Sequence, residues 1–248
     1  AVIDHRGPKF AELGRSILED LKAVFKTQNQ VVIYPASGTG AWEAALVNVL
    51  SPGDKVLMYE TGQFATLWKN MAQKLGFDPV FMPGNWRTGA NAEAIEAQLT
   101  ADTGHKIKAV CVVHNDTATG ITSDISAVRA AINTAGHPAL LIVDTISSLG
   151  SIDFQTDAWG VDVVVAGSQK GLMLPPGLSF NTISPKAWAA CEAGGDRRSY
   201  WDWRDMAAPN EQGFFPYTPA TTLLYGLREA LDMLAEEGLQ AVFDRHAR

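Results

Sequence analysis

The sequence predicts an α/β fold, a three-layer sandwich in which helices cover both faces of a mostly parallel central sheet. Seven short runs rich in β-branched residues are apolar at consecutive positions, which is the pattern of strands buried on both faces. Segments with helical spacing separate most of these runs, and such alternation favours a parallel sheet. The 248 residues are 46% hydrophobic, so the chain can bury a sizeable core.

Turn residues bound the predicted elements. Ser51-Pro52-Gly53-Asp54 ends the first predicted helix, and Gly136-His137-Pro138 ends the fourth. In chain order the predicted strands are Val31–Ala36, Lys55–Glu60, Pro79–Pro83, Ala109–His114, Leu140–Thr145, Val161–Gly167 and Leu178–Ile183. The predicted helices, with apolar residues every three or four positions, are Ala41–Leu50, Phe64–Leu75, Ala92–Leu99, Ile125–Ala135, Pro185–Glu192 and Ala220–Glu237.

The segment from Asp196 to Pro219 breaks this alternation. It is rich in Arg, Trp, Asp and Pro without a clear period, which predicts a long ordered loop or arm. The mixed charges and aromatic residues at its start suit a packed arm or a subunit interface. The last predicted helix follows and ends at Gly238. We therefore expect one large domain over residues 1–237, with residues 238–248 beginning a further unit.

The charge balance argues against a nucleic-acid or anionic-membrane partner. The chain carries 20 Lys and Arg against 27 Asp and Glu, a formal charge of −7, and has no long basic run. No apolar run approaches the ~20 residues that span a bilayer. Cys111 and Cys191 lack the paired spacing of a disulfide framework, and no His, Cys and Asp grouping has metal-ligand spacing. We expect a cytoplasmic protein without a metal.

Three predicted strand ends carry residues suited to chemistry, and open α/β sheets bind ligands at such carboxyl ends. The first is Ser37-Gly38-Thr39-Gly40-Ala41, between a strand and a helix. Its glycines let the backbone approach an anion, and the free amides and positive dipole end of the helix stabilise a phosphate. A purely structural turn into a helix has the same composition, so this segment alone leaves both interpretations open.

The other two strand ends supply a carboxylate and an amine. Asp144 follows the apolar run Ala139–Val143, where a buried carboxylate needs a cation or strong donors; the alternative is an ordinary helix cap or turn residue. Lys170 follows Val161–Gly167 among small residues, where partial desolvation makes an amine a usable nucleophile and base. A solvated loop lysine is the alternative. A phosphate cup, a carboxylate and an amine on one sheet are the groups that pyridoxal phosphate requires.

These segments resemble a known family. Val143-Asp144-Thr145-Ile-Ser-Ser-Leu-Gly150, Gly167-Ser168-Gln169-Lys170 and Pro175-Pro176-Gly177 are similar to the class V, fold type I pyridoxal-phosphate aminotransferases, particularly the serine–glyoxylate and alanine–glyoxylate enzymes. The resemblance runs across nearly the whole chain. It implies the large domain of a fold type I enzyme, with residues 238–248 beginning a C-terminal small domain that is absent from this chain.

The resemblance implies a role for each matching position. Lys170 matches the Schiff-base lysine and Asp144 the partner of the pyridine nitrogen. The phosphate loop falls on Thr39, Gly40 and Ala41, with Gln169 as a further phosphate ligand. Two more positions complete the set: Phe64, where the family places an aromatic ring against the cofactor and animal relatives carry Trp, and Thr117, at a hydroxyl residue that hydrogen-bonds the cofactor.

The resemblance also implies a homodimer. Thr218 matches a residue that reaches the phosphate of the neighbouring subunit's cofactor, whereas relatives carry Tyr where this chain has Phe215. The family binds the substrate carboxylate through an Arg of the small domain, which we expect outside this chain.

The implied reaction is a ping-pong transfer of the amino group of serine or alanine to glyoxylate, with Lys170 as base and acid. Other class V chemistries are the main alternatives: a phosphoserine aminotransferase, or a cysteine desulfurase or lyase. Desulfurases carry His where this chain has Gln169 and Phe64, which disfavours them. A catalytically incomplete or regulatory domain of the same fold is the remaining alternative. His114, which ends a strand, is either a site residue or a satisfied core histidine.

Overall fold

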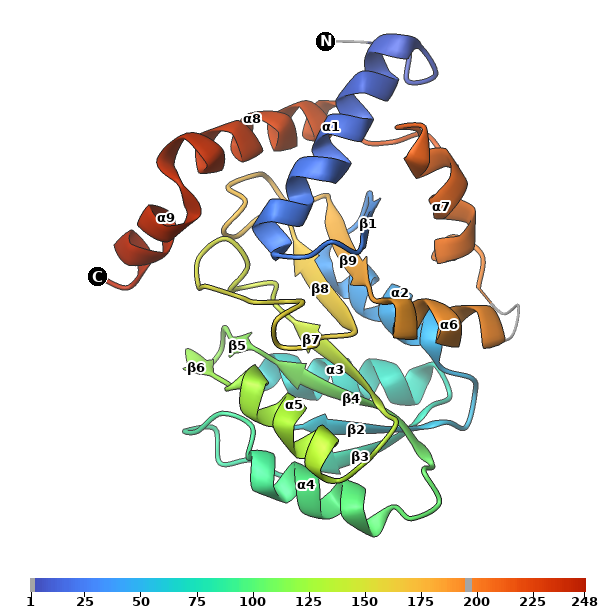
Figure 1. Ribbon diagram of the computed structural model, residues 1–248, viewed down its shortest axis with the longest axis vertical. Coiled ribbons are helices and arrows are strands. Elements are labelled where there is room, and N and C mark those ends of the chain that lie inside the picture. Colours follow the sequence, from blue (N-terminus) through green and yellow to red (C-terminus); the bar gives the residue numbers. More distant parts are fainter. Residues whose placement is uncertain (1–2, 195–197) are drawn as a thin grey trace.

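The computed structural model describes residues 3–194 and 198–248. Residues 1–2, at the start of the predicted large domain, and Asp196 and Arg197, at the start of the predicted arm, lie outside the described residues. In the described part of the chain, helices cover both faces of one central sheet (Figure 1). The predicted three-layer α/β sandwich is therefore confirmed.

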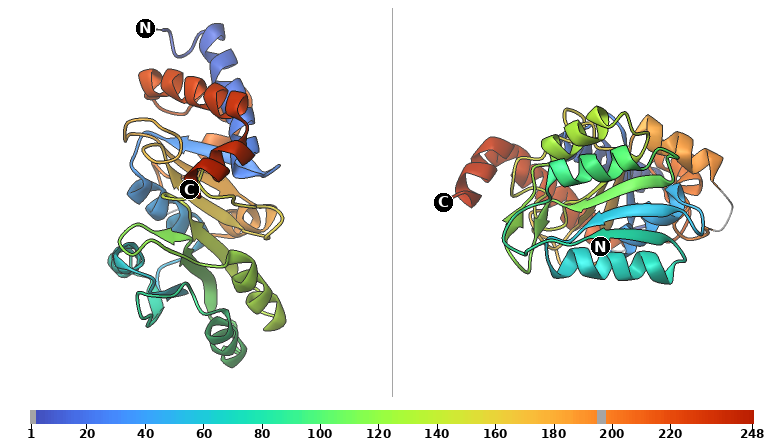
Figure 2. Two further views of the ribbon diagram at one scale, coloured as in Figure 1. Left: turned by 90° about the vertical axis from the view of Figure 1, so that its left-hand side faces the viewer. Right: turned by 90° about the horizontal axis from the view of Figure 1, so that it is seen from below.

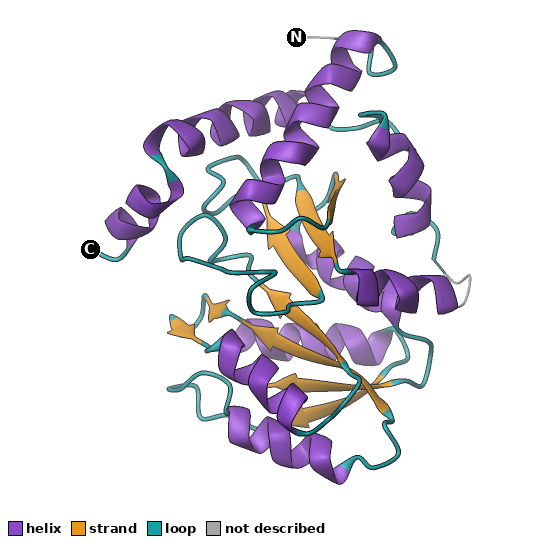
Figure 3. Ribbon diagram, in the orientation of Figure 1, coloured by secondary structure: helices purple, strands orange, loops and turns teal. Residues whose placement is uncertain are grey.

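The central sheet has seven strands in the order β1-β9-β8-β7-β4-β2-β3. The strands are labelled in Figure 1 and drawn in orange in Figure 3. The strands are β1 (Gln30–Tyr34), β2 (Lys55–Tyr59), β3 (Asp78–Met82), β4 (Ile107–Val113), β7 (Leu140–Asp144), β8 (Val163–Gly167) and β9 (Ser179–Ile183). Neighbours from β3 to β8 are parallel, whereas β9 is antiparallel to both β8 and β1. No helix separates β8 from β9, and a connection without a crossover reverses the strand direction.

The six predicted helices are present, each with its ends within three residues of the prediction. They are α2 (Gly38–Val49), α3 (Gln63–Lys74), α4 (Ala92–Ala101), α5 (Ile125–Thr134), α6 (Pro185–Ala193) and α8 (Thr221–Glu237). Within the described residues, none of the helices is long and apolar enough to cross a membrane.

Two apolar cores lie on opposite faces of the sheet, and alternate strand residues feed each of them. In β1, Val31 and Ile33 face the core covered by α1, α4, α5 and α8, while Val32 and Tyr34 face the core under α2, α3 and α6. Since both faces are covered, the strands are apolar at consecutive positions, which explains the pattern from which the sheet was predicted.

Four elements were not predicted from the sequence: α1 (Pro8–Phe25), α7 (Trp203–Glu211), α9 (Leu239–His246) and a small hairpin of β5 (Asn115–Asp116) and β6 (Ile121–Thr122). Figure 2 shows α1 beside α8 and α9 beyond the end of α8. The prediction of a loop throughout the arm is wrong at α7. Asp202 starts this helix because its side chain accepts a hydrogen bond from the Arg204 amide.

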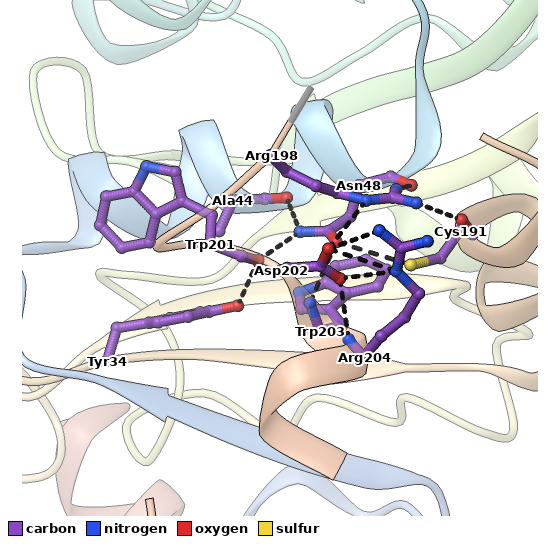
Figure 4. A network of polar contacts seen from close by, with 9 residues as sticks. All are labelled: Tyr34, Ala44, Asn48, Cys191, Arg198, Trp201, Asp202, Trp203 and Arg204. Carbon is purple, nitrogen blue, oxygen red and sulfur yellow. Dashed lines mark hydrogen bonds and ion pairs between the residues drawn. The ribbon is translucent and has the colours of Figure 1, made fainter. Parts of the chain in front are cut away.

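A buried polar network fastens the arm to α2 (Figure 4). The Asn48 side-chain amide donates to the carbonyls of Ala44 (2.8 Å) and Trp201 (2.7 Å), and its oxygen accepts from the Trp203 amide (3.1 Å). The guanidinium of Arg198 donates to the Asn48 carbonyl. Hence one buried asparagine holds both the helix that follows β1 and the segment that leads into α7.

Replacing Asn48 with alanine is expected to lower the free energy of unfolding by about 3 kcal/mol, because buried partners on both segments lose their hydrogen bonds. Asn91→Ala is the matched control: Asn91 caps α4 at an exposed position, and its loss is expected to cost about 1 kcal/mol. Urea unfolding of the two variants measures the difference. Equal losses would show that the Asn48 network contributes no more than a surface cap.

Candidate active site

The carboxyl ends of the parallel strands surround a cavity of about 170 Å³. The register pairs Val113 with Asp144, and Asp144 with Val165, so β4, β7 and β8 end at the same edge of the sheet. The cavity is lined by Ser37, Gly38, Thr39, Trp42, Phe64, Val113, Asn115, Thr117, Asp144, Ile146, Ser147, Gln169 and Lys170. Six of the nine residues predicted for the site are among them: Thr39, Phe64, Thr117, Asp144, Gln169 and Lys170.

Three predicted site residues do not line this cavity. Gly40 faces the ring of Trp201, so closely that an added Cβ would lie 2.7 Å from a ring carbon. Ala41 is fully buried in the core, and Thr218 lies on the exposed surface just before α8. At the start of α2, the cavity is therefore bounded by Ser37, Gly38 and Thr39, slightly earlier in the chain than the loop predicted from the sequence.

The amino end of α2 points into the cavity as an anion-binding element. The first amides of a helix have no partner within the helix, and Ser37, at the cap, makes no side-chain hydrogen bond to them. Gly38 allows close packing here, since a Cβ at this position would lie 2.3 Å from Cδ1 of Ile146. The free amides and the helix dipole together favour a phosphate group.

Gln169 adds a second polar group without a partner. Its side-chain oxygen is buried and accepts no hydrogen bond from the described residues. An unpaired buried amide is costly, and a carboxamide can turn its NH₂ group toward an anion. The Gln169 side chain thus fits a ligand at the amino end of α2.

Asp144 is a buried carboxylate at the end of β7, with 3% of its surface exposed. One oxygen accepts a hydrogen bond from the Ile146 amide (2.7 Å), and the other accepts one from Nε1 of Trp42 (2.9 Å). Burial raises the pKa of Asp144 to about 7, and the nearby Asp116 acts in the same direction, while the two hydrogen bonds lower it. A cationic ligand group in the cavity would restore the charged form.

Lys170 begins a loop that is fixed on both sides, although its own side chain is exposed. The hydroxyl of the buried Ser168 donates to the Pro175 carbonyl (2.8 Å) and accepts from the Leu178 amide (3.2 Å). Gly171 packs so tightly that a Cβ there would lie 2.1 Å from the Leu149 carbonyl oxygen. The amine therefore projects from a rigid loop, as a nucleophile requires.

Asp116 anchors helix α3, which carries the Phe64 ring. This residue was not identified from the sequence. It is fully buried, and one oxygen accepts hydrogen bonds from the amides of Phe64 (3.2 Å) and Ala65 (3.3 Å). A Cβ on Gly62 would lie 2.6 Å from the Asp116 carboxyl carbon. The next residue, Thr117, hydrogen-bonds the Ser147 hydroxyl through its own. The hairpin thus positions both Phe64 and Thr117 at the cavity.

Replacing Asp116 with alanine is expected to cost about 2 kcal/mol of unfolding free energy, because helix α3 loses the hydrogen bonds to its first amides. It is also expected to weaken the binding of pyridoxal phosphate, the cofactor expected from the sequence, because Phe64 loses its support. Asp124→Ala is the control, since Asp124 caps α5 by the same kind of bond to the Ala127 amide (2.9 Å) away from the cavity. Unfolding curves and cofactor titrations separate the effects. If both variants bind the cofactor equally well, Asp116 has no role at the site.

His114 is a core histidine rather than a site residue. It is 2% exposed, its Nδ1 lies 2.8 Å from the Ser148 hydroxyl, and its ring packs edge-on against Phe154 and Trp159. Burial lowers the pKa of His114 to about 4, so the ring is neutral at physiological pH. Among residues 3–194 and 198–248, no group of three or more His, Cys, Asp and Glu could hold a metal ion.

Two larger hollows lie away from this edge and lack its chemistry. One, of about 560 Å³, is lined by residues of α1, β1 and α7 such as Arg15 and Glu211. The other, of about 370 Å³, lies at the amino ends of β4 and β7, beside Ile107 and Leu140. Since open α/β sheets bind their ligands at the carboxyl ends of the strands, the smaller cavity is the candidate active site.

Comparison with known proteins shows the family of this chain. The family model described as aminotransferase class-V matches residues 3–248. A serine–glyoxylate aminotransferase of Methylorubrum extorquens is 55% identical over 98% of this chain, and an L-aspartate–glyoxylate aminotransferase of Paracoccus denitrificans is 49% identical over 99% of it. The solved ureidoglycine–glyoxylate aminotransferase of Bacillus subtilis has a TM-score of 0.91 at 29% identity, over 99% of this chain and 63% of that one. The chain spans 62% of the length of the two curated relatives.

Proposed function

This chain belongs to the class V aminotransferases, and from that premise we propose that it transfers the amino group of serine or alanine to glyoxylate through pyridoxal phosphate held by Lys170. One observation carries the proposal. A single cavity brings together the Lys170 amine, the buried Asp144 carboxylate and the amino end of α2. A carbonyl, a ring cation and a phosphate on one ligand match these three groups.

The residues of the cavity fit this cofactor. The Gln169 carboxamide, whose buried oxygen has no partner among the described residues and whose NH₂ group can turn toward an anion, marks the phosphate end together with the first amides of α2. Asp144, whose pKa burial raises to about 7, marks the end that takes a cation. Phe64 and Thr117 also line the cavity, and we assign Phe64 to the ring face of the cofactor and Thr117 to a hydrogen bond with it. When bound, pyridoxal phosphate supplies an electron sink for the electrons of the broken C–H bond.

The residues of this chain then have separate tasks. Nζ of Lys170 would hold the cofactor and, when it is not bound to it, would take up the α-proton of the substrate and give it back. The Asp144 carboxylate stabilises the ring cation throughout. The amides of Gly38 and Thr39 anchor the phosphate. We propose that Gly40 and Ala41 support this loop by packing against the core rather than by contacting the phosphate, since they do not line the cavity.

The donor is proposed from the relatives. Serine is the donor in the name of the relative at 55% identity, and L-aspartate in the name of the one at 49%, so aspartate is the second candidate. We place the Arg that binds the substrate carboxylate in a C-terminal small domain beginning at residues 238–248. Gln169 in place of His continues to disfavour a desulfurase.

We also propose a cytoplasmic homodimer. Thr218 is exposed and does not reach the cavity of its own chain, which supports a role at the partner's site. Nearby, Tyr200 is 45% exposed and stacks on Tyr217, as expected of an interface surface. The free, buried thiols of Cys111 and Cys191 suit a reducing compartment.

The test is a paired-substrate assay on the full-length protein, with serine, alanine or aspartate as donor and glyoxylate or pyruvate as acceptor. The proposal predicts that serine or alanine with glyoxylate gives the highest kcat/KM, by about tenfold or more over the other pairs. Equal rates with every pair would refute the substrate assignment. A colourless protein that takes up no added pyridoxal phosphate would refute the assignment as an aminotransferase.

A further inference from the structure

Two stacked tryptophan rings lie at the candidate site, and one of them, Trp42, lines the cavity. Trp42 of α2 and Trp68 of α3 stack with ring centroids 5.7 Å apart and an interplanar angle of 13°. Both are almost fully buried, at 3% and 1% exposure. Their indole N–H groups differ: Nε1 of Trp42 donates to Asp144, whereas Nε1 of Trp68 has no partner among the described residues.

The Trp42 bond is one of two that hold the Asp144 carboxylate. Each oxygen of Asp144 receives one donor, the Ile146 amide at 2.7 Å and Nε1 of Trp42 at 2.9 Å. The Ile146 bond comes from the turn that follows β7 itself. Trp42 is therefore the side chain that fixes this carboxylate from another element, and hydrogen bonds to an ionised acceptor are among the strong ones.

Trp42 also contacts the other walls of the cavity. It lies one turn into α2, whose amino end bounds the phosphate side. Its ring meets the Phe64 ring edge-on, at a centroid distance of 6.4 Å and an angle of 61°. One side chain thus connects the three surfaces at which the cofactor is expected to bind: the amino end of α2, the aromatic face and the carboxylate.

We propose that Trp42 is a positioning residue for the cofactor. The indole N–H of Trp42 holds the Asp144 carboxylate in place and favours its charged form. This inference rests on the proposed function, because it assigns to Asp144 the ring cation of pyridoxal phosphate. This role could not be predicted from the residue type, since a tryptophan in an apolar helix is ordinarily a core residue.

The electrostatics of the cavity make this donor important. Asp144 is buried, and the buried Asp116 lies near enough to disfavour its charge. Among the groups lining the cavity, Lys170 is the cationic side chain, and it is engaged once it holds the cofactor. When the indole N–H is removed, one buried oxygen of Asp144 loses its hydrogen-bond donor, and the protonated, neutral form of Asp144 becomes more populated. A neutral acid pairs poorly with the ring cation, so cofactor affinity should fall.

The test compares Trp42→Phe with Trp68→Phe in the full-length protein. Both changes keep an aromatic ring in the stack, but only the first removes a donor to Asp144. Titrations of the cofactor-free proteins with pyridoxal phosphate, followed by visible absorbance, give the dissociation constants. We expect about tenfold weaker binding for Trp42→Phe and a change of less than about twofold for Trp68→Phe.

A double-mutant cycle with Asp144→Asn separates positioning from packing. If Trp42 acts through the carboxylate, Trp42→Phe should weaken binding little further in the Asp144→Asn background. Trp42→Met, which also lacks the donor, serves as a second variant and should repeat both results. Equal losses for Trp42→Phe and Trp68→Phe, or an undiminished loss in the Asp144→Asn background, would overturn the inference while leaving the proposed function intact. A wild-type protein that binds no cofactor would overturn both.

Discussion

Replacing Lys170 with alanine is expected to lower kcat by about 10⁴-fold, because the same amine would hold the cofactor and move the α-proton. Folding should be unaffected, since the Lys170 side chain is exposed and the loop is fixed by Ser168 instead. Steady-state rates with serine and glyoxylate, and a thermal unfolding curve, measure the two parts of this prediction.

Lys186 provides the matched control for Lys170. Like Lys170 it is an exposed lysine, but it lies outside the candidate site: its amine donates to the Ala139 carbonyl beside the hollow at the opposite edge of the sheet. Partial desolvation lowers the pKa of Lys186. Lys186→Ala should leave kcat within about twofold of the wild type. Comparable losses in the two variants would mean that the place of Lys170 in the cavity does not determine activity.

Replacing Asp144 with asparagine is expected to lower kcat by about 10²- to 10³-fold, because the pyridoxal phosphate proposed for this cavity would lose the anion that stabilises its ring cation. The change is nearly isosteric, and the oxygen of the introduced carboxamide can still accept one of the two hydrogen bonds. Asp162→Asn is the control: this buried carboxylate bonds Arg129 (2.7 Å) and the Leu141 amide (2.8 Å) outside the cavity. It should lower stability and leave kcat nearly unchanged.

The same substitution should change how the stability of the cofactor-free protein depends on pH. Burial raises the pKa of Asp144 to about 7 in the folded state, above the unfolded value of ~3.9. Between these values the folded state binds a proton that the unfolded chain has released, so this contribution to stability is full at low pH and is lost as the pH rises through about 7. Relative to the wild type, Asp144→Asn should therefore gain roughly 2 to 3 kcal/mol between pH 5 and pH 8. Urea unfolding at the two pH values tests the sign; a constant difference would show that Asp144 is ionised at pH 5.

The sheet was predictable because its pattern is local. Runs such as Val163–Ala166 are apolar at every position, which two covered faces require. The arm was not predictable in the same way. Helix α7 contains Pro209 and buries only Trp203, Met206 and Asn210, and it is held by tertiary bonds to Asn48 and by the Asp202 cap. Helix α1 was missed as well, although Pro8 opens it and buried residues such as Phe10, Ile17 and Leu21 follow at helical spacing.

The site residues that could be predicted from the sequence are those that lie at strand ends. Lys170 and Asp144 are polar residues after apolar runs, and the structure brings them to one cavity. Trp42 and Asp116 gave no such signal. Trp42 resembles any core aromatic, and the Asp116 carboxylate meets the amides of Phe64 and Ala65 only after a long-range contact forms. The contacts of Trp42 and Asp116 can therefore be identified from the fold but not from the sequence.

The central claim, that Lys170 carries the cofactor, is tested most directly by covalent trapping. The full-length protein, loaded with pyridoxal phosphate, is treated with borohydride, digested and analysed by mass spectrometry. The account predicts one stoichiometric pyridoxyl group on the peptide that contains Lys170, and its loss when the protein is first converted with excess serine. Labelling at another lysine, or labelling that survives in Lys170→Ala at the same stoichiometry, would contradict it.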